Sequence, residues 1–170
     1  MKAKFLIPIL MVAIAITFAC GGDDGDEPVA EKPYLAIEME LRDLINDNRK
    51  TLGMDTLTDH ILLKSSAQNH SRDMALNIVT PLTHGDFEGR MQNIMNGLGI
   101  SDYNTVTYSE MLAAGPKTAQ EVFDVWKNKD SDRMKMQGDY NLIGVGIRQD
   151  ASRVYFFTVI FMKAEINTAQ

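Results

Sequence analysis

Few residues of this 170-residue chain have a type and position that could support chemistry; the chain contains three histidines and a single cysteine. His84 lies in the loop Thr83-His84-Gly85, which follows the helix stop Thr80-Pro81, so His84 does not belong to an apolar helix face. Glu110 follows a short apolar stretch with strand character, where a carboxylate must either face solvent or have a partner. The imidazole of His84 would be such a partner.

The other candidates for chemistry are weaker. His70 falls on the apolar stripe of a helix expected over residues 58–78, which predicts a core-edge histidine with a hydrogen bond and not a ligand. His60, in the first turn of that helix, has no motif that indicates a role. Hydrolysis would need a nucleophile or a metal-bound water besides an acid–base pair. Ser109 is adjacent to Glu110, but neighbours on a strand point to opposite faces, so the two cannot line one cleft.

The segment that ends at Cys20 has the features of an export signal in their usual order. Two early lysines precede an apolar run from Phe5 to Phe18, which is followed by the small residue Ala19. The run is shorter than the ~20 residues needed to span a bilayer. We therefore predict a lipoprotein signal peptide over residues 1–19 and a lipid on Cys20. The alternatives are an ordinary signal peptide and an uncleaved anchor. A lipidated Cys20 cannot act as a nucleophile.

Composition indicates one domain on a tether. Residues 20–33 are acidic and rich in glycine, so we expect a disordered tether there, and residues 34–166 suffice for one domain. The net charge of −6 at pH 7 argues against nucleic acid as a partner, because phosphate binding needs a basic stripe. The expected partner is a membrane, through the lipid on Cys20. The expected location is the cell envelope outside the cytoplasm, at the outer membrane or cell surface.

The apolar periodicity places helices first and strands late, which predicts an α+β domain with helices packed on a small sheet. The strand expected at 141–148 alternates apolar residues with glycines and so has one bare face. The strand expected at 153–162 is nearly all apolar, so it should be central and covered on both sides. The other expected elements are helices over 34–52, 58–78 (N-cap Thr58) and 87–96, a strand over 105–109, and a helix from 118 whose apolar face holds Val122, Val125 and Trp126.

From about residue 38 to 163 the chain resembles the CAP superfamily, also called the SCP domain, in its bacterial branch. The motifs that carry the resemblance are Ile45-Asn46-Asp47-Asn48-Arg49, Asp73-Met74-Ala75, Thr83-His84, Phe87, Arg90, Ser109-Glu110-Met111-Leu112-Ala113-Ala114-Gly115, Trp126, Arg133 and Ile143-Gly144-Val145-Gly146. The resemblance implies a three-layer α-β-α sandwich that encloses a cleft lined by two histidines and two acidic residues.

The resemblance is incomplete at the cleft. His84 stands at the position of the first histidine and Glu110 at that of the first acid, so the resemblance implies that their side chains meet in space. Lys129 replaces the second acid and Asp132 the second histidine. One nitrogen and two carboxylates suit calcium, manganese or magnesium better than zinc. Asp132 fits a turn or cap position equally well. We expect no cofactor and leave weak binding of a divalent metal open.

These expectations lead to a lipid-anchored, extracytoplasmic CAP/SCP domain. The function that they favour is non-catalytic binding of a small apolar, lipid or cell-envelope ligand in a degenerate cleft. One alternative is a hydrolase that uses His84 and Glu110 as an acid–base pair. Another is a surface interaction protein whose cleft is vestigial.

Overall fold

A computed structural model of the chain describes residues 31–165, with side chains from Tyr34 onwards. The signal peptide expected over residues 1–19, the lipidation site Cys20 and most of the tether expected over 20–33 lie outside the described residues. The first helix begins at Glu31, so residues 31–33 form its first turn and not the end of the tether.

Most of the described residues belong to five α-helices and four strands. The helices are α1 (Glu31–Thr51), α2 (Ile61–Ala75), α3 (Phe87–Gly97), α4 (Ala119–Lys127) and α5 (Asp130–Met136). The strands are β1 (Thr58–Asp59), β2 (Thr107–Ala114), β3 (Leu142–Gln149) and β4 (Tyr155–Lys163), and a 3₁₀ turn spans Tyr103–Thr105. Within this part of the chain, no helix has the length and apolar character that crossing a membrane requires.

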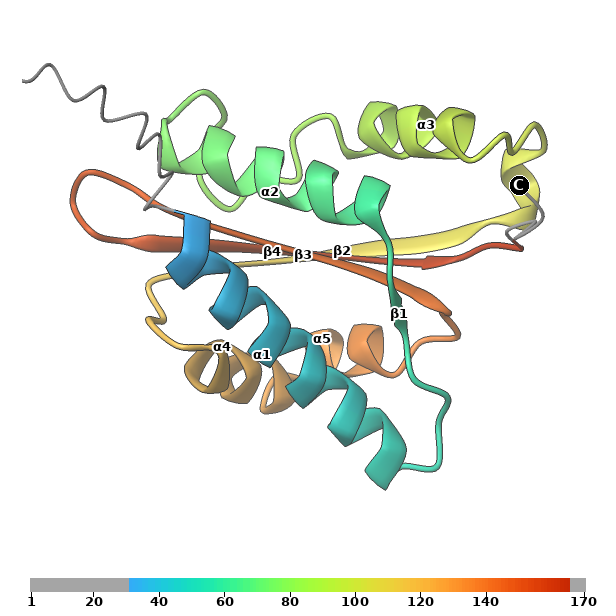
Figure 1. The fold of residues 1–170 in the computed structure, drawn as a ribbon, viewed down its shortest axis with the longest axis horizontal. Coiled ribbons are helices and arrows are strands. Elements are labelled where there is room, and N and C mark those ends of the chain that lie inside the picture. Colours follow the sequence, from blue (N-terminus) through green and yellow to red (C-terminus); the bar gives the residue numbers. More distant parts are fainter. Residues whose placement is uncertain (1–30, 166–170) are drawn as a thin grey trace, which may run out of the picture.

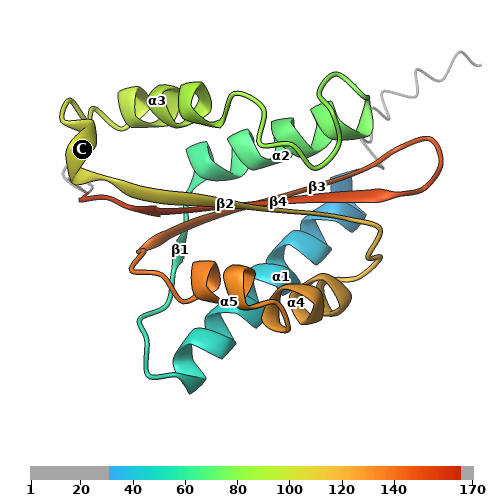
Figure 2. The same cartoon turned by 180° about the vertical axis from the view of Figure 1, so that it is seen from behind.

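The four strands form one sheet in the order β1-β3-β4-β2, in which β1 is parallel to β3 and the other pairs are antiparallel. Helices α2 and α3 cover one face of the sheet, and α1, α4 and α5 lie on the other (Figures 1 and 2). The α+β class and the three-layer α-β-α sandwich predicted from the sequence are confirmed. Strand β2 is an edge strand, which matters for the site described below.

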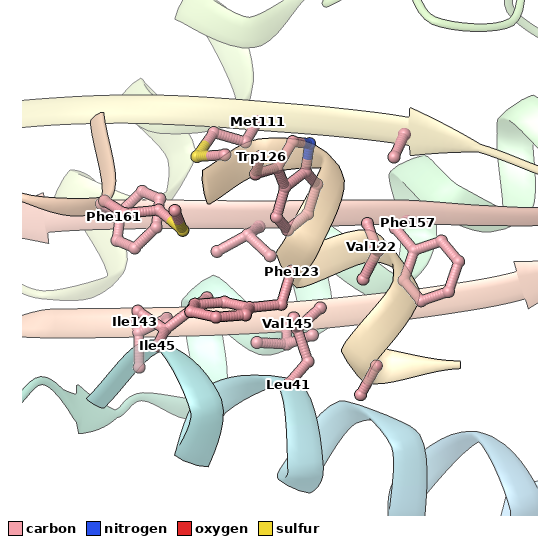
Figure 3. Close-up of a cluster of buried hydrophobic side chains, with 14 of the residues drawn as sticks. Leu41, Ile45, Met111, Val122, Phe123, Trp126, Ile143, Val145, Phe157 and Phe161 are labelled. Carbon is pink, nitrogen blue, oxygen red and sulfur yellow. The ribbon is translucent and has the colours of Figure 1, made fainter. Parts of the chain in front are cut away.

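The larger core lies between the sheet and the layer of α1 and α4 (Figure 3). Phe123 and Trp126 of α4 meet Phe157 and Phe161 of β4 in this cluster. A second cluster, centred on Leu63, joins α2 and α3 to the opposite face of the sheet. β4 contributes buried side chains to both layers, so the prediction of a central strand covered on both sides is confirmed.

The bare face of β3 allows α2 to approach the sheet closely. A Cβ atom on Gly144 would lie 2.3 Å from the main chain at Leu63, and one on Gly146 would lie 2.2 Å from the main chain at Ala67. Any side chain at these two positions would push α2 away from the sheet. The glycines therefore set the distance between α2 and the sheet, and this distance fixes where the loop that carries His84 begins.

The structure corrects several local predictions. Thr58 is not the N-cap of α2: Thr58 and Asp59 form β1, because their main chain pairs with β3, and His60 caps the helix by accepting from the amide of Leu62. α2 ends at Ala75 and leaves Ile78 exposed. The buried face of α4 includes Phe123, whereas Val125 is 53% exposed.

The sequence also underestimated the regular structure around residues 110 and 132. Strand β2 extends to Ala114 and not to residue 109, because Glu110–Ala114 pair with β4 along their whole length. Helix α5 was not predicted. Its charges form ion pairs one turn apart, Lys129 with Asp132 and Asp130 with Arg133, and Met136 is its buried residue.

Candidate functional site

The loop between α2 and α3 places His84 against the edge strand β2. Glu110 lies on β2 with its side chain on the face covered by α2 and α3, while its neighbour Met111 belongs to the core on the other face. This alternation confirms that Ser109 does not share a face with Glu110. The end of α2, the loop 76–86 and the start of α3 therefore act together to bring an imidazole to the carboxylate.

His84 and Glu110 meet as predicted. The Nδ1–H of His84 donates to Oε2 of Glu110 over 2.8 Å. Arg90, in the first turn of α3, donates to both carboxylate oxygens, from Nη1 to Oε1 over 2.7 Å and from Nη2 to Oε2 over 3.1 Å. Its Nη2 also donates to the carbonyl oxygen of His84 over 2.7 Å. Arg90 thus clamps both members of the pair at once.

The three side chains of this cluster differ sharply in exposure. The side chain of Glu110 is 0% exposed, that of Arg90 is 19% exposed and that of His84 is 52% exposed. Because a carboxylate held by a guanidinium is an acceptor, the ring proton of His84 belongs on Nδ1. Nε2 is then the ring nitrogen available to a ligand or a substrate. The cluster therefore exposes one imidazole, which the buried Glu110–Arg90 ion pair holds in a fixed orientation.

His70 supports the His84 loop from below. Its side chain is 3% exposed, and Nε2 contacts the carbonyl oxygen of Thr83 over 3.0 Å. A Cβ atom on Gly85 would lie 3.5 Å from the His70 ring, so the loop packs directly on it. Burial, and then the nearby charge of Arg90, lower the pKa of His70. The prediction of a core-edge histidine with a hydrogen bond is confirmed, and its role is to position the loop.

Aromatic side chains form one wall of the site. The ring of Phe87 lies 6.2 Å from that of His84 and 5.6 Å from that of Tyr108, both measured between centroids. The guanidinium of Arg90 lies 5.2 Å from the centre of the Phe87 ring. Phe87 and Tyr108 are only partly buried. An apolar group of a ligand bound at His84 would therefore have an aromatic surface to contact.

Helix α5 contacts the same strand from the other layer. Nζ of Lys135 donates to the main-chain oxygen of Glu110 over 3.0 Å, which satisfies an acceptor on β2. Asp132 lies one turn earlier and pairs with Lys129 over 3.1 Å. Among the described residues, no hydrogen bond or ion pair joins Asp132 to His84 or Glu110. The structure therefore brings together two of the three cleft candidates.

The residues present do not fit a divalent metal ion. Within residues 31–165, no group of three or more histidine, cysteine, aspartate or glutamate side chains lies close enough to hold one. The positive guanidinium of Arg90 occupies both oxygens of Glu110, so a cation there would meet a like charge and a carboxylate already in use. His84 alone offers a single nitrogen.

A second buried carboxylate, Glu38 on α1, has a structural role away from this site. It accepts hydrogen bonds from the side chain of Gln68 and, over 3.2 Å, from the main-chain amide of Ile147 at the edge of β3. Burial raises its pKa, against the opposing effect of the bond from Gln68 and the charge of Lys64. Glu38 thus closes a strand edge that β1 is too short to cover.

A large groove also lies apart from the pair. It measures about 1450 Å³. It is formed by the end of α3 and the segment that follows it (residues 96–102, 105 and 106), by Asn141, and by residues 163–165 at the end of β4. Its lining includes neither His84 nor Glu110. The pair therefore lies beside the aromatic wall and not inside this groove.

The sequence model of the CAP family, the cysteine-rich secretory protein family, matches residues 42–161. The chain belongs to the CAP family. This match spans the sheet, both helical layers and the His84–Glu110 pair. No curated protein sequence matches the chain.

Solved structures share the fold of this CAP domain. An outer surface protein of Borrelia burgdorferi has 21% sequence identity and a TM-score of 0.61, over 75% of this chain and 93% of its own. An extracellular SCP-domain protein of Bacillus anthracis has 20% identity and a TM-score of 0.65, over 81% of this chain and 44% of its own. A cysteine-rich secretory protein of Staphylococcus aureus has 15% identity and a TM-score of 0.59, over 77% and 39%. The chain spans less than half of the last two proteins, and at these identities the likeness shows the fold alone.

Sequence reasoning did not assign roles to three residues that build the site. Arg90 was noted only as part of the family pattern, and its function as a clamp depends on the direction of its side chain. Lys135 was not considered, because α5 was not predicted. His70 was correctly placed in the core, but its contact with Thr83 needs the loop conformation. A short spacing between the histidine loop and an arginine in the next helix is the signal that could have indicated the clamp.

Proposed function

We propose that this CAP domain is a lipid-anchored, extracytoplasmic protein that binds a small apolar, lipid or cell-envelope ligand at His84 without catalysis. One observation carries the proposal: a buried Glu110–Arg90 ion pair holds the half-exposed imidazole of His84 through Nδ1, next to the ring of Phe87, which leaves Nε2 for a ligand. Nε2 would recognise a polar group of the ligand, and the aromatic wall would contact its apolar part.

The contacts of Glu110 favour binding over hydrolysis. Arg90 uses both carboxylate oxygens and His84 uses one of them again, so the carboxylate is committed to holding the ring. A hydrolase would also need a nucleophile beside the imidazole. Among the described residues, no serine, threonine or cysteine side chain forms a hydrogen bond with the His84 ring. The contacts of Glu110 orient the imidazole of His84, and recognition of a ligand needs no more than this orientation.

One geometric feature favours the hydrolase alternative. A histidine whose Nδ1–H donates to a carboxylate has a bare Nε2, the arrangement in which imidazole acts as a general base. In this reading His84 would activate a water molecule directly, and Glu110 would stabilise the charged ring. The two functions differ in the fate of the ligand: a binding protein releases it unchanged, whereas a hydrolase releases its products.

Location and anchoring complete the proposal. The order of residues up to Cys20 is typical of a lipoprotein signal, and similar folds occur in proteins described as outer surface or extracellular. A domain held at the cell envelope in this way would meet lipids and envelope components as its available ligands.

Co-purification tests the binding function. The mature chain would be isolated from its membrane in mild detergent and examined by native mass spectrometry, together with His84→Asn and the matched control His60→Asn. Asparagine is a good N-cap, so the control should preserve α2. We expect an added mass on the wild type and on the control that is lost from His84→Asn. Equal loading of all three proteins would contradict binding at His84, and conversion of the released ligand into products on incubation would support the hydrolase.

A further inference from the structure

Exposed apolar side chains gather in the loop that leads to His84. Leu76, Ile78 and Leu82 are 61%, 66% and 51% exposed, and all three fall in the segment 76–82 between α2 and the site. Other strongly exposed apolar residues, such as Ile61, Val125 and Met134, are single residues on separate helices. Isolated apolar residues on a surface are ordinary, but three exposed apolar side chains within one loop of seven residues, 76–82, indicate an interaction site.

The conformation of the loop adds a second observation. Leu82 has φ of +59°, in the left-handed region that glycine or asparagine would occupy with less strain. The chain nevertheless has a large apolar residue there, and that residue is half exposed. Strain of this kind is usually found at functional positions. The loop is also anchored, because Val79 packs against the buried cluster of Met74, Ala75 and Phe156.

The loop lies at the end of the domain where α1 begins. Tyr34, in the first turns of α1, contacts Tyr155, with ring centroids 6.3 Å apart. Phe156, the next residue, belongs with Met74 and Ala75 of α2 to the buried cluster against which Val79 of the loop packs. The start of α1 and the loop 76–82 therefore flank the same end of β4, as Figure 1 shows.

The reach of the segment between Cys20 and α1 limits how far this end can lie from a bilayer. Glu31 comes eleven positions after Cys20, so a fully extended connection spans at most ~40 Å. Measured along the chain, the other end of α1 is farther from Cys20 by the length of a 21-residue helix, ~32 Å. If Cys20 is lipidated, the end of the domain that carries the loop is the end held nearest to the lipid.

We propose that the loop 76–82 inserts Leu76, Ile78 and Leu82 into the surface of the bilayer that anchors the chain, so that the His84 site faces the lipid. This inference rests on the lipid anchor in the proposed function. Neighbouring charges indicate an apolar contact and not an electrostatic one. Arg72 and Asp73 pair with each other over 3.2 Å, and the chain carries net charge −6, which does not attract anionic lipid. Uncharged phosphatidylcholine should therefore suffice as the surface.

A site-specific probe tests the contact in the full mature chain. Cys20 is the only native cysteine, and once lipidated it has no free thiol, so Ile78→Cys can be labelled selectively with an environment-sensitive fluorophore. Ile61→Cys is the matched control, since Ile61 is 68% exposed and lies at the opposite end of α2. The labelled proteins would be reconstituted in phosphatidylcholine vesicles containing a lipid with a quencher on its acyl chain.

The expected result is blue-shifted emission and at least about threefold stronger quenching at position 78 than at position 61. Leu76→Ser together with Leu82→Ser should reduce the quenching at position 78. Flotation of the vesicles separates the two claims. A protein that floats but is quenched equally at both positions overturns the loop contact and leaves the anchor intact. A protein that does not float overturns the anchor, and the loop proposal with it.

Discussion

Replacing Arg90 with methionine would remove the cation from a fully buried carboxylate while retaining most of the volume of the side chain. Arg90 makes three charge-assisted hydrogen bonds, two to Glu110 and one to the main chain of His84, at 2.7 to 3.1 Å. Removing one partner of a buried ion pair costs ~3–5 kcal/mol, because the remaining charge stays buried without compensation. His84 remains as a partner and Arg90 is 19% exposed, so we expect the lower end of this range, ~3 kcal/mol.

Urea unfolding measures this loss directly. Trp126 is the only tryptophan and is 1% exposed, so its fluorescence reports global unfolding. With a slope of ~2 kcal/mol per molar urea, a loss of ~3 kcal/mol lowers the midpoint by ~1.5 M. Arg133→Met is the matched control: Arg133 pairs with Asp130 over 2.8 Å, but the two side chains are 41% and 83% exposed, and such pairs contribute ~0–1 kcal/mol.

A double-mutant cycle separates the ion pair from the other contacts of Arg90, such as its packing on Phe87. Glu110→Gln removes the buried charge, so Arg90→Met should cost less in that background, with a coupling free energy above ~1.5 kcal/mol. A midpoint shift for Arg90→Met no larger than that for Arg133→Met, or additive effects of the two site substitutions, would refute the view that a buried ionic base holds His84.

Three further predictions follow from the same contacts. Gly146→Ala should lower the free energy of unfolding by ~2–3 kcal/mol, because the new Cβ atom would lie 2.2 Å from the main chain of α2. Gly97→Ala should lower it by less than ~1 kcal/mol, because its Cβ atom meets only the flexible end of a leucine side chain at 3.0 Å. Thermal unfolding of the two variants compares these losses. The pKa of His70 in the folded protein is below its unfolded value of ~6.5, so its contribution to stability is present above pH ~6.5 and is lost as the pH falls through the folded pKa. His70→Gln should therefore flatten the dependence of the unfolding free energy on pH in this window. An unchanged slope would refute the view that His70 is buried without its charge. Calorimetric titration with zinc at neutral pH should give the same weak heat for the wild type and for His84→Asn, because one imidazole beside a guanidinium is a poor zinc site, and tight binding by the wild type would contradict this.

The layers of the fold could be predicted from the sequence because the two late strands have strong patterns. The glycine alternation in β3 and the apolar run in β4 specify which faces they bury, and both predictions agree with the structure. Helix α5 could not be predicted in this way. Its one buried residue is Met136, Met134 is 66% exposed, and its remaining residues are polar, so no apolar face marks it as a helix.

The site was predicted in part for a different reason. The need of a carboxylate on a strand for a partner, together with the family pattern, identified His84 and Glu110 as a pair, which is confirmed. Arg90 can hold Glu110 only because the first turn of α3 faces β2. The spacing of residues along the chain does not indicate this orientation. Asp132 was placed by alignment to a motif, but its side chain pairs with Lys129, an interaction that local helix geometry favours.

The tautomer of His84 tests the central claim most directly, since the proposed function depends on an Nδ1–H held by Glu110 and on an Nε2 that carries no proton and can bind a ligand. Long-range proton–nitrogen correlation spectra of the ¹⁵N-histidine-labelled chain at pH 8, assigned with His84→Asn, resolve the two ring nitrogens. The account predicts a proton on Nδ1, and an Nε2 signal that shifts when a bacterial envelope lipid extract is added while Nδ1 stays protonated. A proton on Nε2 in the free protein, or an Nε2 signal unmoved by the extract, would contradict it.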